Sequence, residues 1–66
     1  MQDRLIELAE RYIVRGEVIV SRQLMLIDRL RNARLPTVEA EQVLDALEAT
    51  LRQFYQDRQA RLARRQ

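Results

Sequence analysis

The chain has 66 residues, of which 47% are hydrophobic and 33% charged, a composition typical of one small folded domain rather than of a disordered tail or a membrane span. It contains no cysteine and no histidine, which excludes a disulfide framework, a thiolate zinc site and the commonest catalytic base. Twelve basic residues, all arginine, and ten acidic residues leave a net charge of +2, close to neutral for so charged a surface.

The first predicted helix spans residues 3–33. Its apolar residues recur at helical spacing and form one face that is wider than a single partner helix covers. These residues are Leu5, Leu8, Ala9, Tyr12, Ile13, Ile19, Val20, Leu24, Leu26, Ile27 and Leu30. Acidic residues near the start of the segment and arginines near its end suit the helix dipole, so we expect one continuous amphipathic helix.

Residues 12–20 admit a second interpretation. A Tyr-Ile-Val run and a Val-Ile-Val run flank Gly16 and match the pattern of a β-hairpin. An isolated two-stranded hairpin is marginal in water, and the sequence offers no third strand. The helical interpretation is preferred, because the helical period continues through the segment. Gly16 then lies inside a helix, at a cost of about 1 kcal/mol relative to alanine.

The second predicted helix spans residues 38–64. Pro36 cannot continue a helix, Thr37 is a good N-cap, and Glu39 and Glu41 lie in the first turn, where the helix dipole favours carboxylates. The apolar residues again follow a helical period. They are Ala40, Val43, Leu44, Leu47, Leu51, Phe54, Tyr55 and Leu62.

Two such helices, joined by a turn at about residues 34–37, are expected to pack antiparallel as a single all-α helical-hairpin domain over residues 1–66. With the turn centred near residue 35, Leu51 is expected opposite Ile19 and Val20, and Phe54 opposite Gly16. Gly16 then has two interpretations: it lets the Phe54 ring approach the backbone, or it is a tolerated defect.

A lone hairpin has one internal seam, and the wide apolar face of the first helix exceeds what that seam covers. We therefore expect hairpins to associate, most simply as a two-fold dimer that forms a four-helix bundle. The residues predicted at the oligomer interface are Tyr12, Ile13, Val14, Val18, Ile19, Val20, Met25 and Ile27. Gln23 lies within this face and either forms a hydrogen bond across the dimer or lies at a wet edge.

Gly16, Glu17, Val20, Arg22 and Gln23 form a Gly-Glu-x-x-Val-x-Arg-Gln segment. A second set of residues matches the same family pattern: Thr37, Ala40, Val43, Leu44, Glu48, Leu51, Arg58 and Leu62. Together they resemble short uncharacterised helical-hairpin proteins of alphaproteobacteria such as rhizobia. The chain departs from that pattern at Arg34 and Pro36, where the family carries glycine and aspartate, and it lacks the family's histidines. The resemblance implies a bacterial helical hairpin and no known activity.

No motif for chemistry is present. A single glycine cannot build a phosphate-binding loop, Ser21 has no histidine to activate it, and Glu39 and Glu41 project to different sides of their helix. We expect no enzyme activity, no cofactor and no metal. The expected role is a non-enzymatic, homo-oligomeric helical scaffold or protein-interaction module.

The C-terminal arginines provide the alternatives. Arg58, Arg61, Arg64 and Arg65 form a stripe that could contact nucleic-acid phosphates, although capping and pairing within the hairpin is the preferred interpretation. A second alternative is a small regulator that binds and inhibits a protein partner. The sequence shows neither a secretion signal nor an apolar run of about 18 residues, so a cytoplasmic protein is expected.

Overall fold

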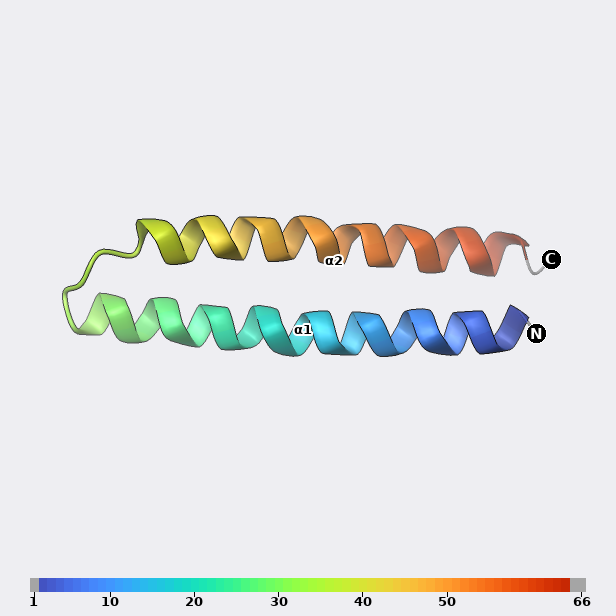
Figure 1. Ribbon diagram of the computed structural model, residues 1–66, viewed down its shortest axis with the longest axis horizontal. Coiled ribbons are helices and arrows are strands. Elements are labelled where there is room, and N and C mark those ends of the chain that lie inside the picture. Colours follow the sequence, from blue (N-terminus) through green and yellow to red (C-terminus); the bar gives the residue numbers. More distant parts are fainter. Residues whose placement is uncertain (1, 65–66) are drawn as a thin grey trace.

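The computed structural model describes residues 2–64, with side chains from residue 4 onward. Within these residues it contains two helices, α1 (Gln2–Asn32) and α2 (Val38–Arg64), which run antiparallel and form a rod of 51 × 14 × 11 Å. Figure 1 shows the start of α1 and the end of α2 at the same end of this rod. The predicted all-α helical hairpin is confirmed. The β-hairpin interpretation of residues 12–20 is wrong, because these residues are helical throughout.

The turn between the helices contains an αL residue. Arg34 has a φ of 60°, its N–H donates to the carbonyl of Arg31 at 3.0 Å, and the N–H of Leu35 donates to the carbonyl of Leu30 at 2.8 Å. This pair of hydrogen bonds is the Schellman motif, which satisfies carbonyls that the helix end leaves unpaired. Thr37 then precedes α2, and its carbonyl accepts the N–H of Glu41 at 2.9 Å.

Replacing Arg34 with glycine is expected to raise the free energy of unfolding by about 1 kcal/mol, because a side chain in the αL conformation costs about 1–2 kcal/mol that glycine avoids. Chemical denaturation at a fixed protein concentration measures this change. Arg34→Ala serves as the control, since it removes the same side chain but keeps a Cβ. If both variants were equally stable, the strain assigned to residue 34 would be absent.

The core is a seam in which buried or half-buried residues recur at alternating spacings of three and four. On α1 this seam consists of Ile6, Ala9, Ile13, Gly16, Val20, Gln23, Ile27 and Leu30. On the opposite side it consists of Thr37, directly before α2, and of the α2 residues Ala40, Leu44, Leu47, Leu51, Phe54, Arg58 and Arg61. Such a repeat averages 3.5 residues, so the hairpin packs as an antiparallel two-stranded coiled coil.

The seam differs from the broad face expected for α1. Ile6, absent from that expectation, is 7% exposed, whereas Leu5 and Leu8 are 48% and 43% exposed. The reason is geometric: a second apolar row lies beside the seam on the same helix, and α2 covers only one of the two. Spacing alone did not distinguish the two rows.

The helices are also offset from the expected register. A Cβ on Gly16 would lie 2.9 Å from Cδ1 of Leu51 and 3.8 Å from Cδ2 of Phe54. The closest neighbour of Gly16 is therefore Leu51, whereas Phe54 was expected at this position. The close approach supports the packing interpretation of Gly16, with Leu51 rather than Phe54 as its main neighbour.

Gly16→Ala is expected to leave stability nearly unchanged. The gain of about 1 kcal/mol in helix propensity is offset by the displacement of Leu51. Ser21→Ala, at an exposed position of the same helix, is the matched control and should gain a few tenths of a kcal/mol. Thermal unfolding of both variants compares them. A full gain of about 1 kcal/mol for Gly16→Ala would mean that position 16 has room for a methyl group.

Gln23 lies in the seam between the two helices. Its Nε2 donates to the backbone carbonyl of Ala40 at 2.8 Å, and the side chain is half-buried. The bond joins the two helices of one chain. Gln23 therefore neither forms a hydrogen bond across a dimer nor lies at a solvated edge of the face, the two interpretations drawn from the sequence. A half-buried polar residue with one specific partner favours one register, as a buried polar residue does in coiled coils.

Candidate interaction surface

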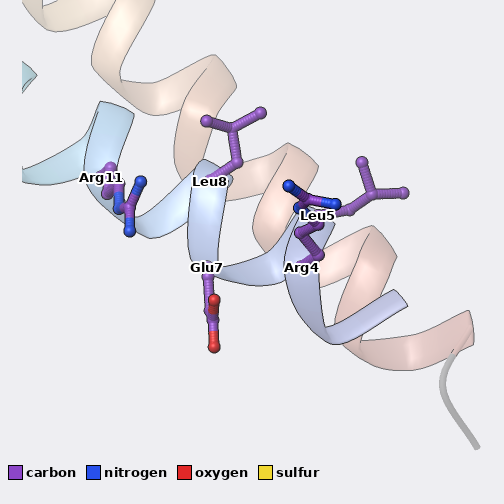
Figure 2. A pocket seen from close by; sticks show the side chains of 5 residues that line it. All are labelled: Arg4, Leu5, Glu7, Leu8 and Arg11. Atoms are coloured by element: carbon purple, nitrogen blue, oxygen red, sulfur yellow. The ribbon is translucent and has the colours of Figure 1, made fainter. Parts of the chain in front are cut away.

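A second apolar row runs along α1 beside the seam. Leu5, Tyr12, Ile19 and Leu26 repeat every seven residues, each directly before a seam residue, and Leu8 lies next to them. Their exposed fractions range from 38% for Leu26 to 48% for Leu5. Figure 2 shows Leu5 and Leu8 projecting from one side of α1 while Glu7 projects from the other. The row is thus apolar, aligned and uncovered.

Tyr12 and Ile19 border a groove between the helices. The groove has a volume of about 280 Å³, and Thr50 and Phe54 line its α2 side. The ring centroids of Tyr12 and Phe54 lie 5.9 Å apart, with the planes tilted by 32°. Neighbouring space of about 340 Å³ extends along Tyr12 to Gln53 and Asp57. We call this side of the rod the open flank. Its residues are Leu5, Leu8, Tyr12, Ile19 and Leu26 of α1 with Val43, Thr50, Gln53, Phe54 and Asp57 of α2.

The opposite side of the rod is closed by polar contacts between the helices. The Tyr55 hydroxyl donates to Oε2 of Glu17 at 2.6 Å, and Nη2 of Arg31 lies 3.5 Å from Oε1 of Glu41. The hydrogen bond to Glu17, followed by desolvation, raises the pKa of the Tyr55 hydroxyl above its ordinary value. We call this side the closed flank. The closed flank also carries Leu24, which is 48% exposed and lies seven residues after Glu17. The two flanks differ because polar bridges between the helices span the closed flank, whereas the open flank presents a row of apolar side chains.

The residues predicted at the oligomer interface fall into three groups. Tyr12 and Ile19 lie on the open flank. Ile13 and Ile27 are only 3% and 5% exposed, and Val20 is half-buried, because all three belong to the seam against α2. These three are therefore unavailable to a second chain. The remaining three lie exposed on the outer face of α1: Val14, Val18 and Met25.

The sequence interpretation left Leu5, Leu8 and Leu26 out of the interface. The signal that identifies Leu5 and Leu26 is their spacing of seven residues from Tyr12 and Ile19, which places all four on one row. Assigning heptad positions separates this row from the seam. Treating all apolar residues of α1 as one broad face combines the two rows.

The C-terminal arginines are engaged within their own helix. The Arg58 guanidinium lies 5.6 Å from the centroid of the Tyr55 ring, and Nε of Arg61 donates to Oδ2 of Asp57 at 2.9 Å. Both side chains are half-buried at the end of the seam, whereas Arg64 is exposed and Arg65 lies outside the described residues. The predicted four-residue stripe is therefore not a uniformly free basic surface.

A different row of arginines borders the open flank. Arg15, Arg22 and Arg29 repeat every seven residues on α1, each three residues after a member of the apolar row. All three are exposed, and the described residues give them no ion pair. Along α1 each apolar side chain from Tyr12 to Leu26 is thus followed by a cationic rim residue.

Two kinds of site are absent from the part of the chain that the structure describes. Residues 2–64 contain no group of three or more acidic side chains placed to hold a metal ion. Neither described helix has an apolar stretch long enough to cross a membrane. Comparison of the chain with protein-family models, with characterised proteins and with solved structures finds no match.

Proposed function

We propose that this chain is a non-enzymatic, self-associating helical scaffold, in which two hairpins pack through their open flanks to form a four-helix bundle. The observation that carries the proposal is the open flank itself. Five large apolar side chains of α1 lie there in register, each between 38% and 48% exposed, next to a shallow groove. A second copy offers the same apolar surface, so one two-fold operation covers both flanks.

The small core supports the same proposal. Six apolar residues of the described chain are buried, and none is less than 2% exposed. Domains of this length bury only about 60% of their unfolded surface and commonly need a further source of stability. With no disulfide available, association between chains supplies the missing burial.

The nucleic-acid alternative has less support at the C-terminus, because Arg58 and Arg61 each have a partner in α2. In the proposed bundle these arginines stabilise the end of the seam. The polar faces of the rod remain outside the bundle and present charged helical surfaces to other macromolecules, as a scaffold requires.

Thermal unfolding at several protein concentrations tests the proposal. A dimer whose folding is coupled to association is stabilised by mass action, so its unfolding midpoint should rise with chain concentration. Circular dichroism over about a hundredfold concentration range measures this shift. A midpoint that stays constant over the whole range would mean that the hairpin folds as a monomer and that the open flank needs no second copy.

A further inference from the structure

The two helices contribute unlike halves to the open flank. The α1 half is large and cationic: it presents Leu8, Tyr12 and Ile19, with Arg22 and Arg29 on its rim. The α2 half carries smaller side chains apart from Phe54, and it lacks basic residues between residues 39 and 51. At seven-residue spacing from Gln53 and Asp57 it carries, on successive turns, Glu39, Val43, Ala46, Thr50 and Ala60.

Two hairpins can join these flanks by a two-fold axis in two ways. An axis perpendicular to the rod places α1 against the partner's α1 and puts the turns at opposite ends. An axis parallel to the rod places α1 against the partner's α2 and puts both turns at the same end. Neighbouring helices are antiparallel in both arrangements, so helix direction does not distinguish them.

Side-chain size and charge do distinguish them. The perpendicular axis packs large residues on large ones and brings two rows of arginines together, and like charges across an interface are unfavourable. The parallel axis packs the large α1 row onto the small residues of the partner's α2, and large facing small is how packed helices interdigitate. It also replaces the opposing arginines with Gln53, Ala46 and Glu39 of the partner.

The parallel axis also determines the register. A rotation about an axis along the rod leaves every residue at its own height, so Gly16 stays level with the partner's Leu51 as it is with its own. Counting along the helices from this level brings Leu26 to within two residues of the height of the partner's Val43, and Leu8 to within one residue of the height of the partner's Ala60. Arg29 comes within one residue of the height of the partner's Glu39, close enough for an ion pair, and the symmetric pair forms at the same time.

From these features we infer that the occupant of the open flank is a second copy of this chain, related by a two-fold axis parallel to the rod, with both turns at the same end of the bundle. The inference rests on the proposed function, because it specifies how the two flanks of the dimer meet. It adds the topology, the register and an intermolecular Arg29–Glu39 ion pair.

Energy transfer between labelled chains tests the topology. The sequence has no cysteine, so Val38→Cys and Gln59→Cys each provide a single label on the exposed side of α2. One preparation carries a donor at residue 38, and two others carry an acceptor at residue 38 or at residue 59. The two sites are about 30 Å apart along a helix at 1.5 Å per residue.

With both turns at one end, transfer from residue 38 to the partner's residue 38 should exceed transfer to the partner's residue 59. The reverse order would overturn the inferred topology and leave the dimer of the proposed function intact. No transfer in either mixture, at concentrations where the chain is folded, would overturn both.

Charge exchange tests the register. Arg29→Glu and Glu39→Arg, each alone, create two like-charge contacts per dimer and should raise the dimer dissociation constant about tenfold. The double variant restores both pairs and should bring the constant back to within about threefold of the wild-type value. If the two substitutions changed the free energy of dimer dissociation additively in the double variant, the Arg29–Glu39 pair would be contradicted. Arg31→Glu is the matched control, since Arg31 pairs with Glu41 on the closed flank of the same chain.

Discussion

Replacing Ile13 with alanine is expected to lower the free energy of unfolding by about 2–4 kcal/mol, which is most of the stability of so small a domain. Ile13 is the most buried residue of the seam, with 3% of its surface exposed. Truncation to alanine loses the transfer free energy of the removed methyl and methylene groups and leaves a cavity between α1 and α2. Chemical denaturation at fixed chain concentration measures the loss.

Val14→Ala is the control for Ile13→Ala. Val14 is the next residue along the chain, but it is 58% exposed on the outer face of α1. Its truncation should change stability by less than about 0.5 kcal/mol, because alanine is also the better helix former. Similar losses for the two variants would contradict the assignment of the seam.

Replacing Ile19 with glutamate is expected to raise the dimer dissociation constant at least about a hundredfold. A symmetric bundle contains position 19 twice, so each dimer would have to desolvate two carboxylates within the apolar row, at about 1–3 kcal/mol each, although Arg15 and Arg22 lie within reach on the same helix. Sedimentation equilibrium of the variant, compared with the wild type, measures the shift toward monomer.

Val14→Glu makes a comparable chemical change on the outer face and should leave the dimer unchanged. The pair of variants separates the open flank from the wider interface predicted from sequence, which included both residues. If Val14→Glu dissociated the chain as strongly as Ile19→Glu, the interface would lie on the outer face of α1. If neither variant had an effect, association through either surface would be contradicted.

The helices themselves could be predicted from the sequence because their signals are local. Pro36 and Thr37 mark the start of α2, which begins at Val38 as expected, and α1 at Gln2–Asn32 is displaced by one residue from the predicted 3–33. The end of α1 carries no glycine; Arg34 takes the αL position of the Schellman motif instead. Because glycine is the usual residue at this position, the motif cannot be recognised from the residue types alone.

The seam and the register depend on longer-range packing. Two apolar rows lie one residue apart on α1, and helical spacing fits both, so only the position of α2 determines which row is buried. The row that α2 covers includes Gly16 and Gln23, neither of which is a typical core residue. Their contacts with Leu51 and Ala40 compensate for this, and neither contact is visible in the sequence alone.

The residues of the candidate surface could likewise be predicted only in part, because their exposure depends on where α2 packs. Tyr12 and Ile19 were predicted at an interface because they are apolar, and they do lie on the open flank. Ile13 and Ile27 were chosen by the same criterion but belong to the hairpin core. The contacts of the C-terminal arginines could have been predicted from helical spacing. Arg58 lies three residues after Tyr55 and Arg61 four residues after Asp57, and residues three or four apart are neighbours on one helix.

Sedimentation equilibrium of the wild-type chain tests most directly whether a second copy covers the open flank. The chain has a mass of 7.9 kDa, and at micromolar concentration the four-helix bundle predicts a species of twice that mass. A folded species of 7.9 kDa throughout the accessible concentration range would contradict the proposed dimer.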